Sequence, residues 1–414
     1  MMKHNQDLDI ELVRSQFPAL HQRYKEKAVV FFDGPGGSQV PQSVLNAMSE
    51  YLGQFNSNLG GHFFSSEKTV ALVEQARECA RALFNASSAE SIVFGANMTS
   101  LTLSLSRSIS RDWLPGDEVV VTGLDHYANV SSWVEAAKDR KAKVYQARID
   151  PATGGLDVDH TIDLIGKKTK LVALTLASNT TGTLVDANPI IEAAHKVGAK
   201  VYLDAVHLMP HQLIDVDSLG CDFAVCSAYK FFGPHLGIAY IAPQWLQTLE
   251  PYKVLPATNI GPGRFETGTL NFEALAGFCA AVDYLAGWGT GKGDLRDRLV
   301  SSYQQIGRYE ESLSAYFLQQ IASISGVTVY GHYQADTGLR TPTFAINIDN
   351  YLPQDVAKML GEQNICVWSG HFYAPELIKQ LGTKERGGVV RIGMMHYNTF
   401  AEIDKLKRAI EALQ

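Results

Sequence analysis

Short apolar, β-branched runs alternate with helical stretches between about residues 90 and 241 of this 414-residue chain, and this alternation constrains the fold most. The runs SIVF, EVVVTG, KVYQARI, KLVALTLAS, KVYLDAV, FAVCSAY and GIAYIA are typical of strands. Stretches such as NVSSWVEAAKDRKA and NPIIEAAHKVGA have helical spacing. Strands that alternate with helices form a mostly parallel sheet with helices on both faces, so the sequence predicts an α/β fold.

The pattern changes beyond about residue 285. A long helical stretch at 295–323 is followed by the strand-like runs VTVYG, TPTFAINI, ICVWSG and VVRIGMM, with a helix near 353–362 and another from about 399. The glycine-rich GWGTGKGD at 287–294 is the best linker signal. We predict a large α/β domain over 18–286 and a smaller α+β domain built from 1–17 and 287–414.

Composition limits the possible partners and the compartment. The formal net charge is -7, which gives no reason to expect nucleic acid or an anionic membrane as a partner. No apolar run approaches the roughly 18 residues that span a bilayer, and the N-terminus lacks an apolar signal segment, so we expect a cytoplasmic protein. The five cysteines have no metal-ligand spacing, so we expect core thiols and no metal site.

Polar residues end three neighbouring predicted strands. These residues are Asn179 after KLVALTLAS, Asp204 and His207 at the end of KVYLDAVH, and Ser227, Tyr229 and Lys230 at the end of FAVCSAYK. In open α/β sheets, ligands bind at the carboxyl ends of the strands. A carboxylate and an isolated lysine at such an edge suit pyridoxal phosphate, because its aldehyde forms a Schiff base with lysine and its ring nitrogen needs an acid.

The phosphate of such a cofactor would also need a binding site. The segment SIVFGANMTSLTLSL combines a strand, a turn of small residues and a helix start, with Thr99 and Ser100 as candidate caps. A helix N-terminus offers free N–H groups and partial positive charge, so Asn97, Met98 and Thr99 are predicted to contact the phosphate.

Each residue also has an ordinary interpretation. Asp204 could cap a helix or pair with a base, Lys230 could extend to solvent past its aromatic neighbours, and His207 could be a hydrogen-bonded core residue. The turn, the acid and the lysine occur together and in the required chain order, which favours the cofactor site.

This pattern resembles the class V aminotransferases, which have the pyridoxal-phosphate-dependent transferase fold type I, and is closest to their cysteine desulfurase and selenocysteine lyase branch. The resemblance runs from FFDGPGGSQVPQSV to VVRIGMMHYNT, with DAVH and SAYK in place of the branch motifs DxxQ or DxxH and SxHK. It implies that Lys230 forms the Schiff base and Asp204 binds the ring nitrogen. It also implies that His207 contacts the 3-oxygen, Ser227 the phosphate and Tyr229 the cofactor as a hydrogen-bond donor.

Further motifs extend the resemblance. DHYANV implies that Tyr127 stacks on the cofactor ring, with His126 as the alternative, and SNTTGT implies that Asn179 contacts the cofactor. GRFETGTLN resembles a loop that crosses the interface of a homodimer, with Thr269 at the other subunit's phosphate. VVRIGMMHYNT places Arg391 where a planar guanidinium binds the substrate carboxylate in two hydrogen bonds.

One loop departs from the desulfurase pattern. The sequence SGHFYAP has Tyr373 where the desulfurases carry their catalytic cysteine, and a phenol cannot take up sulfur as a persulfide. Cys366 lies seven positions earlier and is expected to be a packing residue. His371 and Tyr373 are predicted to line the substrate site, and Trp368 stands where desulfurases tend to carry arginine. The departure disfavours the usual persulfide route.

The predicted function is that of a pyridoxal-phosphate-dependent enzyme acting on a small amino acid through an external aldimine and chemistry at the α-carbon. Transamination, elimination and epimerisation all remain open. One alternative is a cysteine-independent C–S or C–Se lyase or an amino-acid epimerase. Another is a degenerate scaffold that binds the cofactor without turnover, although the intact Asp204, Lys230 and Arg391 argue against it.

Overall fold

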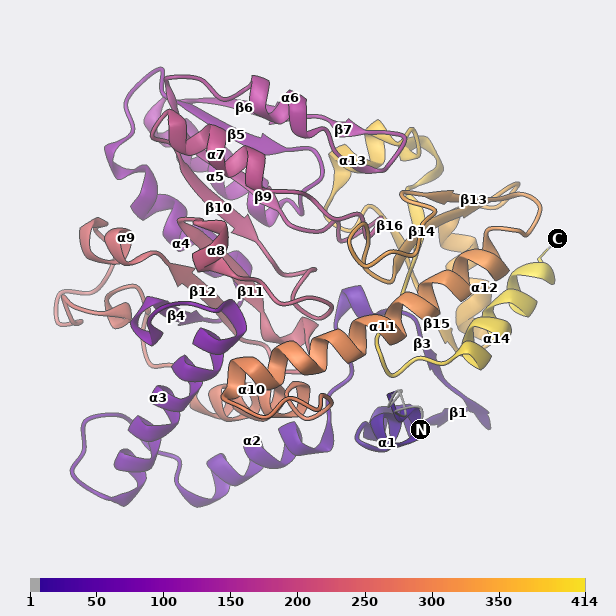
Figure 1. The fold of residues 1–414 in the computed structure, drawn as a ribbon, viewed down its shortest axis with the longest axis horizontal. Coiled ribbons are helices and arrows are strands. Elements are labelled where there is room, and N and C mark those ends of the chain that lie inside the picture. Colours follow the sequence, from indigo (N-terminus) through magenta and orange to yellow (C-terminus); the bar gives the residue numbers. More distant parts are fainter. Residues whose placement is uncertain (1–7, 414) are drawn as a thin grey trace, which may run out of the picture.

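The computed structural model describes residues 8–413. Its centre is a seven-stranded sheet, at left in Figure 1, with the strand order β4-β12-β11-β10-β9-β5-β6. These strands are β4 (Ile92–Gly95), β12 (Gly237–Ile241), β11 (Phe223–Ser227), β10 (Lys200–Asp204), β9 (Thr169–Thr175), β5 (Glu118–Thr122) and β6 (Lys143–Ala147). The strands from β11 to β6 run parallel, and β12 is antiparallel to both of its neighbours. The predicted, mostly parallel sheet is confirmed.

Both faces of this sheet are buried, because alternate residues of its strands pack into different hydrophobic clusters. On β5, Val120 belongs to one cluster and Val119 and Val121 to the other, and Leu203 and Tyr202 divide β10 in the same way. Helices on both sides supply the rest of the two clusters. They are α3 (Phe64–Phe84), α7 (Asn188–Lys196) and α10 (Phe272–Leu285), with α2 (Gln42–Gln54) packed on α10, and, on the second face, α4 (Met98–Ile109) and α5 (Ala128–Arg140).

The C-terminal part, orange to yellow at right in Figure 1, forms the predicted smaller α+β unit. Its antiparallel sheet has the order β13-β14-β17-β16. The strands are β13 (Val327–Tyr330), β14 (Thr343–Ile348), β17 (Val389–Gly393) and β16 (Trp368–Gly370), and the covering helices are α12 (Pro353–Glu362) and α14 (Phe400–Glu411). Next to this sheet, β3 (Val30–Phe31) pairs with β15 (Ile365–Cys366).

The N-terminal segment packs first into the core of the large sheet and then into the core of the smaller unit, which the sequence did not indicate. After α1 (Ile10–Ser15), the Phe17 ring packs edge-on against Phe232 and Tyr284 in the core of the large sheet. Val30 and Phe32, in contrast, are buried in the core of the smaller unit. The cores therefore divide the chain differently from the predicted boundary at residue 18. Residues 1–7 of the predicted segment lie outside the described residues.

The long helix α11 (Leu295–Ile321) contributes to both cores. Its first half packs into the core of the large sheet and its second half into the core of the smaller unit. The residues concerned are Leu299, Tyr303 and Ile306, and then Leu313, Phe317 and Ile321. Figure 1 shows α11 running from beside α10 towards α14. The predicted boundary at 287 thus comes just before a helix that both units share.

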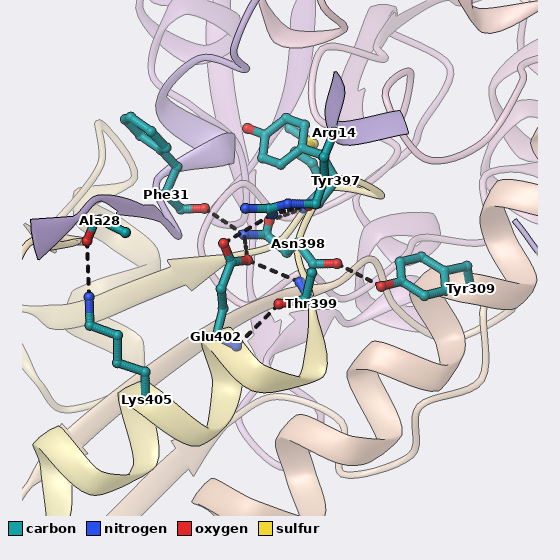
Figure 2. A network of polar contacts seen from close by, with 10 residues as sticks. Arg14, Ala28, Phe31, Tyr309, Tyr397, Asn398, Thr399, Glu402 and Lys405 are labelled. Carbon is teal, nitrogen blue, oxygen red and sulfur yellow. Dashed lines mark hydrogen bonds and ion pairs between the residues drawn. The ribbon is translucent and has the colours of Figure 1, made fainter. Parts of the chain in front are cut away.

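A polar network holds the start of α14 against the N-terminal segment (Figure 2). Thr399 and Glu402 form a capping box, and Glu402 also pairs with Arg14 at 3.0 Å. The Asn398 side chain donates to the carbonyl of Phe31 at 2.9 Å and to Glu402 at 3.0 Å. The network therefore ties β3, α1 and α14 together just beyond the end of β17.

No helix among residues 8–413 has both the length and the apolar character that a membrane span requires.

Candidate active site

A cavity of about 460 Å³ lies at the carboxyl ends of β9, β10 and β11, where the sequence predicts the site. The predicted residues that line it are Asn97, Met98, Thr99, Asn179, Asp204, His207, Ser227, Tyr229 and Lys230. The structure thus brings together side chains from the helix start, from three strand ends and from the turn after β11. Further lining residues that sequence reasoning missed include Pro35, Thr175 and His235.

Lys230 projects into this cavity from a short 3-10 turn after β11. Its amine donates to the carbonyl of Pro35 at 2.5 Å and lies 4.6 Å from the centre of the Tyr229 ring. Burial lowers the pKa of this amine to about 7, and the positive charge of Arg391 acts in the same direction, while Asp204 opposes it. A large share of the amine is therefore neutral at physiological pH, as a nucleophile or base requires.

Asp204 is the last residue of β10 and is buried. One of its oxygens accepts the N–H of Val206 at 2.8 Å. Burial raises the pKa of this carboxyl to about 6, against the Val206 N–H and the charge of Lys230. At neutral pH the side chain is mostly ionised, so it can hold a proton on a ring nitrogen.

Of the two candidates for ring stacking, Tyr127 and its alternative His126, the structure places His126 in the cavity wall. The Tyr127 side chain packs against the cluster that holds α4 and α5, and its N–H donates to the carbonyl of Tyr373 at 2.7 Å. Burial, aided by nearby positive charges, lowers the pKa of His126 to about 4. The flat, neutral imidazole suits stacking on an aromatic ring.

Asp125 explains why the histidine faces the cavity, and sequence reasoning missed it. Its buried carboxyl group, whose pKa burial raises to about 8, is hydrogen-bonded to the Thr122 hydroxyl, to the Asn129 side chain at 2.7 Å and to the Thr175 N–H at 3.1 Å. These bonds join the loop to two strands and to α5, and so they fix the direction of the next side chain, His126. The motif DHYANV contains the acid, but only its partners reveal this role.

The first turn of α4 borders one end of the cavity. Asn97 caps the helix by accepting the Ser100 N–H at 2.9 Å, so the predicted caps Thr99 and Ser100 lie within its first turn. The Met98 N–H donates to the hydroxyl of Ser227 at 2.9 Å. The N-terminus of this 12-residue helix and a hydroxyl thus meet where the resemblance puts the phosphate.

A close contact between β12 and this turn depends on Gly237. A Cβ atom at this position would lie 2.4 Å from the backbone carbonyl carbon of Asn97. Only glycine therefore lets the strand approach the helix start so closely.

A second cavity of about 430 Å³ adjoins the first and shares Lys230, Tyr229 and Asn179 with it. Much of its remaining wall comes from the smaller unit, including Trp368, His371, Phe372, Tyr373 and Arg391. The predicted substrate residues His371, Tyr373 and Arg391 thus lie together in this second cavity.

Arg391, on β17, is held at the boundary between the two units. It donates to the carbonyl of Asn179 at 2.8 Å, and its guanidinium lies 4.1 Å from the centre of the Phe372 ring. Its Nε has no partner among the described residues although it is buried, and nearby Asp33 has a buried oxygen without a partner. A buried cation with an unused donor favours a bound carboxylate.

The loop that carries Tyr373 is held in an unusual backbone conformation. Phe372 and Tyr373 have φ of 49° and 58°, in the left-handed region that residues other than glycine rarely adopt. Two bonds to the large domain hold this loop, from the Asn179 side chain to the carbonyl of Phe372 at 2.9 Å and from the Tyr127 N–H to Tyr373. The Tyr373 ring stacks on His126 at 5.1 Å. The loop thus forms one wall of the second cavity, beside the predicted stacking position.

None of the five cysteines, all of which lie within the described residues, lines either cavity. Cys366 pairs with Phe31 in the small parallel ladder, and burial raises the pKa of its thiol to about 11. Thr269, predicted to reach another subunit, is exposed and does not line the cavities of its own chain.

The residues in the first cavity fit pyridoxal phosphate. Lys230 offers a partly neutral amine, Asp204 an ionised acid, His126 a flat neutral ring, and the start of α4 an anion site. Arg391, whose buried Nε has no hydrogen-bond partner among the described residues, lines the adjoining cavity.

Comparison with solved structures supports the same fold. The chain superposes on a cysteine desulfurase from Thermococcus onnurineus with a TM-score of 0.87 and 25% identity, covering 100% of this chain and 99% of that one. It superposes on the cysteine desulfurase CsdA from Escherichia coli with a TM-score of 0.84, 25% identity and 98% coverage of each chain.

Relatives of known name cover almost the whole chain. A cysteine desulfurase of Serratia proteamaculans and the aminotransferase-like protein FGM3 of Gibberella zeae are each 30% identical, over 98% and 97% of this chain and 98% of their own lengths. A cysteine desulfurase of Synechococcus elongatus is 30% identical over 98% of this chain, which spans 64% of that relative's length.

The aminotransferase class-V family matches residues 30–406. This match, the relatives and the solved structures confirm the predicted family and the predicted fold type. They also confirm that the chain is an enzyme that depends on pyridoxal phosphate. The chain belongs to the aminotransferase class-V family.

Proposed function

We propose that the protein is a pyridoxal-phosphate-dependent enzyme that acts at the α-carbon of a small amino acid. The observation that carries the proposal is that Lys230, Asp204 and Arg391 come from three different strands or turns and line two adjoining cavities. When bound, the cofactor supplies an aldehyde and an electron-withdrawing ring that stabilises negative charge at the substrate α-carbon.

The residues of the chain divide the remaining tasks. Arg391 binds the carboxylate of the amino acid and so orients its α-carbon. Lys230, whose pKa is near 7, holds or donates a proton at that carbon. Asp204 keeps the proton on the ring nitrogen, and His126 covers one face of the ring. The aromatic side chains of Phe372 and Tyr373 form an apolar part of the wall of the second cavity.

The substitution Lys230→Ala tests this proposal. We expect the purified wild-type protein to be yellow after incubation with pyridoxal phosphate, and the variant to lose the visible band. A spectral screen of amino acids against the loaded protein then identifies the substrate. A wild-type protein that stays colourless after reconstitution contradicts the proposal, and a yellow protein that reacts with no amino acid favours the scaffold alternative.

A lyase that releases sulfur or selenium without a catalytic cysteine is the second candidate function. The observation that favours it is that no cysteine of the chain lines either cavity, while the desulfurase relatives align over nearly all of it. Incubation with cysteine, cysteine sulfinate and selenocysteine tests this function. Product release no faster than in Lys230→Ala excludes it.

We also propose a homodimer and a cytoplasmic location. Val254, Leu255 and Ile260 are 71%, 93% and 80% exposed on the loop before Thr269, an unusual exposure for apolar side chains of a single chain. A second copy that covers this loop would bring Thr269 to the partner's cavity. The five free cysteines suit a reducing compartment.

A further inference from the structure

His207 lines the first cavity and is buried in its wall, three residues beyond Asp204. Its Nε2 lies 3.1 Å from the hydroxyl of Thr341. Its Nδ1 has no hydrogen-bond partner among the described residues. This nitrogen is also not among the fully buried polar atoms that lack a partner, so part of its surface is accessible. Nδ1 is therefore the ring nitrogen that His207 presents to the cavity.

Thr341 belongs to the segment that enters β14 of the smaller unit, and its backbone is held firmly. Its N–H donates to the carbonyl of Gly182 at 2.9 Å, and its own carbonyl accepts the Thr343 N–H at 2.7 Å. Gly182 has φ of 77° and lies so close that a Cβ would be 2.4 Å from the carbonyl oxygen of Thr343. The hydroxyl of Thr341 thus has a fixed position relative to His207.

The single hydroxyl proton of Thr341 has two acceptors within reach. The carbonyl of Gly182, at 3.3 Å, already accepts the N–H of the same residue, whereas Nε2 of His207, at 3.1 Å, has no other partner. The shorter contact to the otherwise unused acceptor is the better hydrogen bond. When Thr341 donates to Nε2, the one proton of a neutral imidazole must be on Nδ1.

The surroundings keep His207 neutral. Burial lowers its pKa well below the ordinary value, and the charges of His211, Arg391 and Lys230 act in the same direction. The His211 ring lies edge-on at 5.8 Å and is itself paired with Glu310 at 2.9 Å. Which nitrogen carries the proton, rather than whether the ring is charged, therefore decides what His207 offers to the cavity.

We propose that Thr341 is a positioning residue that selects the tautomer of His207, so that Nδ1–H donates a hydrogen bond to the 3-oxygen of bound pyridoxal phosphate. This inference rests on the proposed function, since it requires that cofactor in the first cavity. A donor at the 3-oxygen stabilises its negative charge and makes the nitrogen that joins Lys230 to the cofactor less basic. Thr341 would thus tune the cofactor from a domain that does not hold it.

The test compares Thr341→Val, which removes the hydroxyl at nearly constant volume, with Thr341→Ser, which keeps it. In the cofactor-loaded proteins, we expect the pH midpoint of the visible absorbance change to rise by about half to one pH unit in Thr341→Val, as one neutral hydrogen bond is worth. Thr341→Ser should titrate like the wild type. Thr183→Val is the matched control, because Thr183 is buried nearby but bonds to Thr153 and not to His207.

A second measurement reads the tautomer without substitution of Thr341. In the loaded protein labelled with ¹⁵N-histidine, we expect the His207 signal, identified by its loss in His207→Gln, to show a protonated Nδ1. A protonated Nε2, or a Thr341→Val midpoint equal to the wild-type value, overturns the inference. Either result in a yellow wild-type protein leaves the proposed function standing, whereas a colourless wild type removes the function itself.

Discussion

The surroundings of Lys230 favour the neutral form of its amine, and this has a consequence for cofactor uptake. Only the unprotonated amine attacks an aldehyde, and burial and Arg391 lower its pKa to about 7. We expect the rate at which the apoprotein takes up pyridoxal phosphate to rise with pH, with a midpoint near 7. Stopped-flow absorbance at a series of pH values measures this rate.

The arginine supplies the control for this experiment. Arg391→Met removes a positive charge that disfavours the ammonium form of Lys230, so the midpoint should move to higher pH. Arg391→Lys keeps the charge but loses the planar fork, so the midpoint should stay near 7 while the carboxylate of an amino acid binds more weakly. Equal midpoints in the wild type and Arg391→Met would show that the charge has no part in the lowered pKa.

The positions of Asp204 and Lys230 could be predicted from the sequence because Asp204 ends a recognisable strand and Lys230 follows one, and the edge of a parallel sheet collects such positions. Arg391 lies in the middle of β17 in the antiparallel sheet, so only the family resemblance pointed to it. The choice between His126 and Tyr127 could not be predicted. It depends on the bonds of Asp125 to Thr175 and to other residues, and Thr175 is 50 positions away in the chain. A pattern of residue types contains no information about that contact.

At the scale of the element, the contact between β12 and the start of α4 depends on one glycine. Gly237→Ala would force the turn at Asn97 to move, since the new methyl group would meet backbone at 2.4 Å. We expect a loss of about 1–3 kcal/mol in the free energy of unfolding and a rise of about tenfold in the dissociation constant of the cofactor. Urea unfolding and equilibrium dialysis measure the two effects.

Gly361→Ala is the matched control for that change. Gly361 lies in α12, and a Cβ there would meet nothing within 4 Å. Alanine in an open helical position should raise the free energy of unfolding by about 0.5–1 kcal/mol and leave cofactor binding unchanged. If both alanine variants bound the cofactor like the wild type, the close approach at Gly237 would not matter to the site.

The capping box of α14 should contribute measurably to the stability of the protein (Figure 2). Glu402→Ala removes the bond to the Thr399 N–H and the largely buried pair with Arg14. We expect the free energy of unfolding to fall by about 2 kcal/mol. Lys405 lies on the same helix, and Lys405→Ala removes an exposed hydrogen bond to the carbonyl of Ala28. This change should lower the free energy of unfolding by less than about 0.5 kcal/mol. Equal losses in the two variants would contradict this ranking.

Elements with clear periodicity, such as β11, α5 and α11, were predictable because each buries one face or both. The start of α4 was less so: Thr99 and Ser100 have the right chemistry for a cap, but Asn97 takes that place because its side chain reaches the Ser100 N–H. Capping preference ranks residue types and does not distinguish neighbouring positions of equal merit.

At the scale of the whole molecule, the exposed apolar loop before Thr269 predicts how copies associate. Leu255→Asp places a charge where the proposed homodimer buries an apolar side chain, so we expect dissociation at concentrations where the wild type is dimeric. Leu114→Asp is the control, since Leu114 is 66% exposed on a different loop. Sedimentation velocity measures the oligomeric state. A wild-type monomer, or equal behaviour of both variants, contradicts the proposed interface.

The division into domains was the least predictable feature. The sequence separates the two sheets correctly, because their strand patterns differ on either side of residue 285. It could not show that Phe17 packs under the large sheet or that Val30 and Phe32 serve the smaller one, since apolar residues in a short segment do not reveal which core receives them.

The 27-residue helix α11 fills both hydrophobic cores with a single rigid rod. If either core unfolded alone, it would expose apolar side chains of a helix on which the other core still depends. The chain should therefore denature in one cooperative step, with spectroscopic probes in Trp133 and Trp368 reporting the same midpoint. Since the same rod fixes the two sheets relative to each other, substrate capture would require local movement of the loop around Tyr373 rather than a swing of one domain.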